Sequence, residues 1–218
     1  MKNYQMLPIF IIVTLVSFSC KKDNKVMLFN GENLDNWTIF VPDSGAVPED
    51  VFRVEDGLIK DAGLPFGYIR TRETFSNYAL HLEWRWTGEP ANSGVLLHIN
   101  GEDKLWPTCI EGQLMNQNAG DLAPIRKGTG ITVDGTEYRV ETDTLWYAIA
   151  PKMHESSENA PGDWNSYDIV CNGSDIELTV NGVLQNKGTN ATLNSGFIGI
   201  QSEGGPVEFR NIWLEPLE

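Results

Sequence analysis

The chain has 218 residues, with 16 Lys and Arg against 30 Asp and Glu, and a formal net charge of −14 at pH 7. With 41% hydrophobic and 10% aromatic residues it is too apolar for a disordered chain, and its length suits one β-rich domain that buries roughly 70% of its extended surface. The acidic balance argues against a nucleic-acid-binding surface and against electrostatic docking on anionic lipid, because both need basic patches.

The first segment has the pattern of an export signal. Lys2 precedes an apolar run, Leu7–Val16, and the small residues Ser17 and Ser19 lie just before Cys20. The run is too short to span a bilayer, which takes about 20 apolar residues. Small residues before a cysteine resemble the signal of bacterial lipoproteins, in which the cysteine is acylated.

This resemblance divides the chain into three parts. It predicts a signal peptide over residues 1–19, a lipidated Cys20 within a short tether over 20–25, and one domain over 26–218. The expected location is the bacterial cell envelope, as a periplasmic or outer-membrane lipoprotein that meets the membrane only through its lipid anchor. Ordinary secretion, with an unmodified cysteine after the cleavage site, is the alternative.

Beyond this segment, a period of two dominates the sequence. Tyr78–Trp86 alternates large apolar with polar or small residues over nine positions, which predicts a half-buried strand. Asp56-Gly57 and Asn181-Gly182 each separate two short apolar runs, and both pairs are strong signals of a two-residue hairpin turn. Further strands are predicted at Phe66–Thr71, Val95–Asn100, Cys109–Leu114, Tyr167–Cys171, Phe197–Gln201 and Val207–Leu214.

No window of eleven or more residues shows a convincing helical period. About a dozen short strands predict an all-β fold of two packed antiparallel sheets. The turn-rich stretch 116–135 and the polar stretch 153–163 are predicted as long loops, where binding residues tend to lie. Cys109 and Cys171 occur in apolar strand-like runs, which favours two buried thiols, although pairing stays open.

Common catalytic motifs are missing from the sequence, and the three histidines are far apart. The distinctive passage is Trp106–Leu114. On a strand, Glu111 and Gln113 share one face with Cys109, and a carboxylate among apolar residues is costly in a core. Such a pair makes sense along a sugar-sized groove, but an ordinary solvated sheet face explains it equally well.

Other side chains have weaker signals. By alternation His98 points opposite to its apolar neighbours, so it could line the same groove. Trp106, beside Pro107, is the aromatic residue expected to be exposed for stacking. His154 lies in the second polar loop, either as a surface histidine or as an acid/base group delivered by that loop.

A series of short motifs makes the resemblance to one family specific. They are Leu28-Phe29-Asn30-Gly31, Leu34-Asp35-Asn36-Trp37, Asn92-Ser93-Gly94-Val95, Glu111-Gly112-Gln113, Gly162-Asp163-Trp164-Asn165, Val180-Asn181-Gly182, Gly199-Ile200-Gln201 and Phe209-Arg210-Asn211-Ile212. In this order they resemble the bacterial 3-keto-disaccharide hydrolase domain family, from about Val26 to the end of the chain. Each motif alone is weak, and the ordered series is strong.

The resemblance implies a concanavalin-A-like jelly-roll sandwich that processes an oligosaccharide or keto-glycoside. Members of the family are associated with cleavage of glycosides whose sugar carries a ketone at C3. That ketone acidifies the hydrogen on C2, so a base can remove it and the enolate can expel the C1 substituent. The reaction needs a base, a stabiliser for the enolate oxygen and an acid for the departing oxygen.

The same resemblance assigns Glu111 as the leading base or metal-coordinating carboxylate and Gln113 as a substrate-orienting amide. Further groove candidates, from strand alternation and loop position, are His98, Arg70, Gln201, Trp106, Lys152 and His154. Arg70 would hold an enolate or a pair of hydroxyls, and Lys152 and His154 would act from the loop. A divalent metal is allowed, but the sequence shows no self-sufficient ligand set.

Retaining glycosidases of this fold place two carboxylates on one strand, whereas this chain has only Glu111 there. A two-carboxylate hydrolysis would need a partner from another strand, such as Glu203. The rival interpretations are a non-catalytic, lectin-like sugar-binding module and a tethered interaction domain, since the fold alone does not determine the function.

Overall fold

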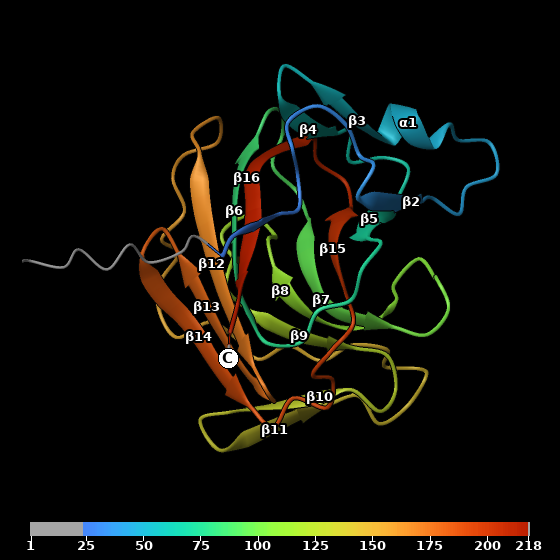
Figure 1. Cartoon of the computed structure of the whole chain (residues 1–218). Helices are drawn as coiled ribbons and strands as arrows, with labels where there is room; N and C mark the ends of the chain where they lie inside the picture. The colour runs from blue at the N-terminus through green and yellow to red at the C-terminus, as the bar shows by residue number, and fades with distance from the viewer. Residues whose placement is uncertain (1–23, 218) are drawn as a thin grey trace, which may run out of the picture.

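The structure is a computed structural model that describes residues 24–217. The predicted signal peptide and Cys20 lie outside the described residues. Within them the chain folds into two antiparallel sheets that face each other (Figure 1). This arrangement confirms the predicted all-β sandwich.

The larger sheet has ten strands. Its order is β11 (Thr136–Arg139), β10 (Gly130–Val133), β14 (Val183–Thr189), β13 (Asp175–Val180), β12 (Asn165–Asn172), β6 (Tyr78–Trp86), β16 (Val207–Pro216), β4 (Leu58–Asp61) and β3 (Phe52–Glu55), with β1 (Val26–Met27) paired to β16.

The smaller sheet has six strands and carries the candidate site. Its order is β2 (Trp37–Phe40), β5 (Gly67–Thr71), β15 (Phe197–Ser202), β7 (Gly94–Asn100), β8 (Thr108–Gln113) and β9 (Leu122–Ile125). The described chain has a single short helix, α1 (Pro48–Val51), and no helix with the length and apolarity to cross a membrane.

Local sequence explains the predicted hairpins. Asp56 and Gly57 both have positive φ, at 55° and 76°, and join β3 to β4. Asn181 and Gly182 do the same at 50° and 78° between β13 and β14. These are the backbone angles that two-residue turns require in twisted hairpins, and Asn, Asp and Gly tolerate them best. Both predicted turns are confirmed.

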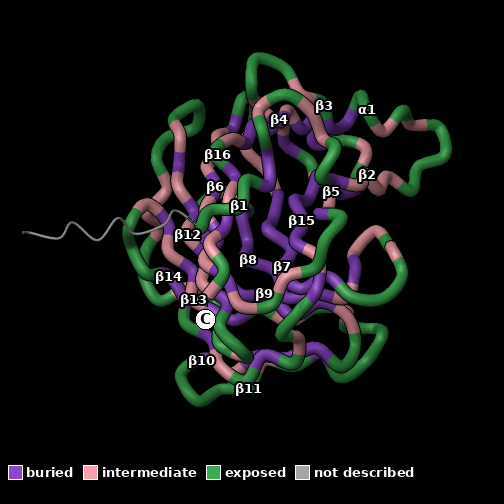
Figure 2. Tube along the Cα trace, in the orientation of Figure 1, coloured by how far each residue is buried: buried purple, intermediate pink, exposed green. Residues whose placement is uncertain are grey.

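The main core lies between the two sheets, where Figure 2 shows the buried residues concentrated in the centre of the molecule. Leu82 and Trp84 of β6 contribute from the larger sheet, and Val95 and Ile110 contribute from the smaller one. A second apolar cluster covers the outer face of the smaller sheet, and its buried members are Tyr68, Leu96, Ile99, Cys109 and Ile125. Loops close over this outer face, so it is not a free solvated surface.

One predicted loop is wrong. The stretch 116–135 contains β9 and β10, and β9 pairs with β8 at the edge of the smaller sheet. Both strands have only four residues, and Pro124 lies inside β9, so neither has a clear alternating pattern. Proline is tolerated there because an edge strand need not donate every backbone N–H group. Cys109 and Cys171 are free and buried, as predicted.

Candidate active site

A pocket of about 200 Å³ opens on the outer face of the smaller sheet. Its lining comes from strands β8, β9 and β15 and from the loops around them: Asn92, Trp106, Glu111, Gln113, Met115, Ala123, Ile125, Trp146, Tyr147, Ile149, Gln201 and Glu203. Two carboxylates, three amides and three aromatic rings therefore converge on a space suited to one sugar ring.

Gly94 makes room for the central carboxylate. It pairs with Gln113 on β8, and on its other side Val95 pairs with Ile200, the residue before Gln201. A Cβ atom on Gly94 would occupy the space of Oε1 of Glu111. Gly94 therefore adds no side chain to the floor of the pocket, whereas the strands on its two sides carry the amides Gln113 and Gln201. The Glu111 carboxylate lies in the space that Gly94 leaves free.

Glu111 is only 4% exposed, and its Oε1 atom has no hydrogen-bond partner. Burial, and after it the charge of Glu203, raises the pKa of Glu111 to about 8. No cation of the described chain pairs with this carboxylate, which is unusual because buried charges are normally compensated. Perturbed carboxylates of this kind concentrate at functional sites. The alternative of a solvated sheet face is therefore wrong.

Glu203 supplies the second carboxylate, from the turn after β15. Its Oε2 accepts a hydrogen bond of 2.8 Å from Nδ2 of Asn92, and its Oε1 accepts a longer one of 3.4 Å from Nε1 of Trp106. Burial raises the pKa of Glu203, while Trp106, Gln201 and Asn92 each lower it. Glu203 is thus held in place by donors, whereas Glu111 is not.

Several oxygen atoms in the pocket have no donor. Besides Oε1 of Glu111, these are Oδ1 of Asn92 and Oε1 of Gln201, both buried without a hydrogen-bond partner. Buried acceptors normally receive hydrogen bonds, so these three oxygens are available to accept bonds from the hydroxyl groups of a bound sugar. Gln113 differs, because its Oε1 accepts bonds of 2.9 Å from the backbone N–H groups of Leu114 and Met115.

Aromatic rings form one wall of the pocket. The ring of Trp106 lies against Trp146 with 4.7 Å between centroids, and Trp146 in turn contacts Tyr147 at 4.7 Å. Nε of Arg126 donates a hydrogen bond of 2.7 Å to the Trp106 carbonyl oxygen. Trp106 is therefore half-buried in a stack of rings and fixed by its backbone, so the expectation of a ring exposed for stacking is only partly met.

The structure brings together Glu111, Gln113, Trp106 and Gln201 but places Arg70 elsewhere. Arg70 forms a bidentate pair with Asp103, with Nε–Oδ1 and Nη2–Oδ2 distances of 2.8 and 3.0 Å, and stacks on Phe197. It lies three strands away from Glu111 and does not line the pocket. Its partner belongs to the loop that carries Trp106, so Arg70 anchors that loop.

His98 does not line the pocket either. Its φ is +56°, and the register of β7 on β8 shifts between Leu97 and Asn100. This bulge inverts the alternation, so the His98 ring turns to Tyr78, at 5.6 Å between centroids, and Nδ1 lies 3.1 Å from the Leu193 carbonyl oxygen. The prediction from strict alternation is wrong at this position.

The two loop residues also lie outside the pocket. Nζ of Lys152 donates a hydrogen bond of 2.7 Å to the Gln117 carbonyl oxygen, and its backbone N–H donates to Oδ1 of Asp121. It therefore fastens the turn that follows β8. His154 is exposed in the next turn and lines no part of the pocket.

Sequence reasoning missed the segment that closes the pocket. Residues 146–150 run along β9, and the backbone N–H of Ala148 donates to the Pro124 carbonyl oxygen at 3.1 Å. This segment brings Trp146, Tyr147 and Ile149 to the pocket. The run of apolar residues from Leu145 to Ile149 was the available signal in the sequence. The segment pairs with β9 only through isolated bridges, so the run does not show the alternation of a regular strand.

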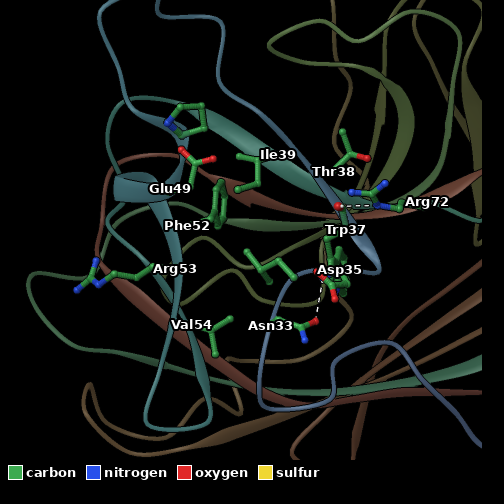
Figure 3. Close-up of a pocket in the computed structure, with 12 residues that line it drawn as sticks. Asn33, Asp35, Trp37, Thr38, Ile39, Glu49, Phe52, Arg53, Val54 and Arg72 are labelled. Atoms are coloured by element: carbon green, nitrogen blue, oxygen red, sulfur yellow. Dashed lines mark hydrogen bonds between the residues drawn. The ribbon is translucent and has the colours of Figure 1, made fainter.

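A larger cleft of about 560 Å³ lies at the open edge of the sandwich, between β2 and β3 (Figure 3). In Figure 3 the apolar side chains of Ile39, Phe52 and Val54 lie between Glu49 and Arg53 on one side and Asn33 and Arg72 on the other. Among the described residues, no side-chain nitrogen or oxygen atom that lines this cleft is buried without a hydrogen-bond partner. The cleft is a gap between edge strands and has no feature that indicates chemistry.

The family of the chain follows from a match that spans the whole sandwich. The 3-keto-alpha-glucoside-1,2-lyase-like domain matches residues 24–215, including every pocket residue. The chain belongs to this family. Membership indicates a carbohydrate-active domain of the glycosyl hydrolase type, whereas no functionally curated protein matches the sequence.

Solved structures show the same fold at low sequence identity. A candidate glycosyl hydrolase from Parabacteroides distasonis ATCC 8503 is 21% identical, with a TM-score of 0.64 over 89% of this chain and 94% of that one. The Bacillus licheniformis beta-glucanase is 11% identical, with a TM-score of 0.60 over 91% and 100%. The carbohydrate-binding module CBM66 from Bacillus subtilis is 8% identical, with a TM-score of 0.52 over 81% and 93%. Catalytic and non-catalytic proteins thus share this fold.

Proposed function

We propose that this domain cleaves 3-keto-glycosides by removing the C2 proton and eliminating the C1 substituent. The observation that carries the proposal is the pair Glu111 and Glu203, two carboxylates with raised pKa values that face one sugar-sized pocket. An elimination needs one group to accept a proton and one to donate a proton, and a carboxyl pair with separated pKa values provides both. Family membership supports the choice of a 3-keto-glycoside as the substrate.

The environments of the two carboxyl groups divide the roles. Near neutral pH Glu111, with its pKa of about 8, holds a proton. Glu203 accepts two hydrogen bonds that favour its charged form, so it ionises first. Glu203 is then the base and Glu111 the acid, which reverses the role that sequence reasoning gave to Glu111.

The electron balance of the step is simple. The Glu203 carboxylate takes the C2 proton, and the electrons of that C–H bond form the enolate of the C3 ketone. The enolate collapses to a C1=C2 double bond as the C1–O bond breaks, and Glu111 gives its proton to the departing oxygen. Proton exchange between the two carboxyl groups restores the starting state, and addition of water to the enone completes a net hydrolysis.

The pocket also contains groups that stabilise the enolate oxygen. Gln113 is locked by two backbone bonds to its Oε1, which leaves its Nε2 group as a donor for substrate. Within residues 24–217 no group of three or more His, Cys, Asp or Glu residues is placed to hold a metal ion. A hard divalent cation at the unpartnered oxygens of Glu111, Gln201 and Asn92 would require Glu111 to be ionised, and Glu111 would then not be available as the acid.

A lectin-like module is the second candidate, favoured by the likeness to CBM66 and by the aromatic wall. It would bind sugar without needing a perturbed carboxyl group. Incubation of the protein with a 3-keto-glucoside, with and without chelator, separates the two. Turnover that is abolished in Glu111→Gln and in Glu203→Gln supports the enzyme. Saturable binding without turnover, unchanged in both variants, supports the module and refutes the elimination.

A further inference from the structure

The mouth of the pocket has an apolar rim. Met115, Tyr147 and Ile149 line it and are 46%, 49% and 42% exposed. Twelve large hydrophobic side chains are exposed in residues 24–217, and three of them line this one pocket. Exposed apolar side chains gathered around one opening mark a binding surface, whereas single scattered ones do not.

The rim is held in a fixed shape. The Met115 backbone N–H donates to Oε1 of Gln113 at 2.9 Å. On the opposite side, the Arg126 N–H donates to the Trp146 carbonyl oxygen at 2.7 Å, and Ala150 exchanges two bonds with Leu122 at 2.8 and 3.0 Å. These bonds fix the backbone on both sides of Tyr147 and Ile149. The exposed side chains therefore form a surface that exists before any ligand arrives, which lowers the cost of binding.

Polar and apolar groups are separated by depth. Glu111, Gln113 and Gln201 lie at the bottom of the pocket and are almost fully buried. The rim residues Met115 and Ile149 offer no hydrogen bond to a sugar hydroxyl. Since the pocket holds about one ring, the C1 substituent of a glycoside bound there must leave through the mouth and lie on this rim.

We propose that the rim of Met115, Tyr147 and Ile149 is a subsite for an apolar, planar leaving group. The preferred substrates are then aryl 3-keto-glycosides, whose leaving groups are phenols, rather than 3-keto-disaccharides. This inference rests on the proposed function, because it places the sugar ring in the pocket. A second sugar would leave its hydroxyl groups without partners against Met115 and Ile149, which costs free energy.

The test uses binding, so that the intrinsic reactivity of phenols does not enter. Dissociation constants are measured by calorimetry for phenyl and methyl glucosides, as both anomers, neither of which carries the C3 ketone needed for turnover. We expect phenyl glucoside to bind at least about 10-fold more tightly, from the apolar area that the ring buries. Ile149→Ser and Tyr147→Ser should each reduce this preference several-fold.

Leu145→Ser is the matched control, because Leu145 directly precedes the segment 146–150, is 74% exposed and does not line the pocket. It should keep the full preference for the phenyl ring. Equal binding of phenyl and methyl glucosides, or a preference that survives in both rim variants, would overturn the subsite. If no 3-keto-glycoside is cleaved but the rim-dependent preference persists, the proposed function fails and the subsite stands. If 3-keto-glycosides are cleaved but no preference for the phenyl ring is found, the proposed function stands and the subsite fails.

Discussion

Gly94 and Glu111 compete for the same space: a Cβ atom on Gly94 would lie where Oε1 of Glu111 is found. The glycine is therefore required by the position of the carboxylate and not by backbone conformation. Gln113, which pairs with Gly94 on β8, and Gln201, on β15 at the other side of β7, line the pocket on either side of Gly94. A substitution at Gly94 tests the floor of the pocket without removing any polar group.

Gly94→Ala should displace the Glu111 carboxylate and destabilise the fold by about 1–3 kcal/mol, the usual cost of overpacking a tight site. We expect cleavage of a 3-keto-glucoside to fall at least about 10-fold, because the acid is moved from its position. Gly45→Ala is the control, since Gly45 is exposed and its Cβ would meet nothing closer than 3.4 Å. Unchanged turnover in Gly94→Ala would show that the position of Glu111 does not matter for the reaction.

Glu111→Gln should change how stability depends on pH. The pKa of Glu111 is about 8 in the fold against its usual 4.5, so ionising it is costly only in the folded state. The stability that the protonated Glu111 contributes to the fold is fully present below pH 4.5 and is lost as pH rises through about 8. Chemical denaturation should show the free energy of unfolding of the variant gaining on that of wild type between pH 4 and 9, by up to about 5 kcal/mol.

Asp61 provides a check on that measurement. It is buried at the end of β4, and burial raises its pKa to about 7 from the usual 3.8. Asp61→Asn should therefore flatten the stability profile between about pH 4 and pH 7, a lower window than that of Glu111→Gln. Parallel profiles for wild type and Glu111→Gln would mean that Glu111 is not perturbed as the structure indicates.

Trp106→Phe should move the acidic limb of the pH–rate profile to higher pH. The Nε1–H group of Trp106 donates to Glu203 and lowers the pKa of that carboxyl group. Its loss should raise the pKa of Glu203, and with it the acidic limb, by roughly half to one pH unit. Trp146→Phe is the control, because it alters the same ring stack without removing that bond. An acidic limb that stays in place in Trp106→Phe would exclude Glu203 as the base.

The parts of this fold that the sequence predicted are those that local rules determine. Alternation over Tyr78–Trp86 and the turns at Asp56-Gly57 and Asn181-Gly182 depend only on neighbouring residues. Glu111 and Gln113 share a face for the same reason. His98 failed because a β-bulge inverted the alternation, and no composition signal marks that bulge.

The loop-borne part of the site could not be predicted, because it depends on pairings between distant segments. Arg70 and Asp103 are 33 residues apart, and only the strand order brings them together. Tyr147 and Ile149 reach the pocket through bridges to β9, a strand that was itself predicted as a loop. Family resemblance identified Glu111, but its role depends on Glu203, whose approach is a property of the folded chain.

The pair of Arg70 and Asp103 should act on the site from a distance. Asp103 accepts from Arg70 and also from the Tyr68 hydroxyl at 2.7 Å, so it holds the loop that carries Trp106. Asp103→Asn removes the charge but keeps an acceptor, and should cost about 1 kcal/mol of stability because the pair is partly exposed. A looser Trp106 should raise KM for a 3-keto-glucoside several-fold and change kcat less.

Glu102→Gln is the control, because Glu102 is an exposed neighbour of Asp103, and it should change neither KM nor kcat. A fall in kcat alone would contradict this anchoring role, since the loop would then affect the chemistry and not the binding of substrate.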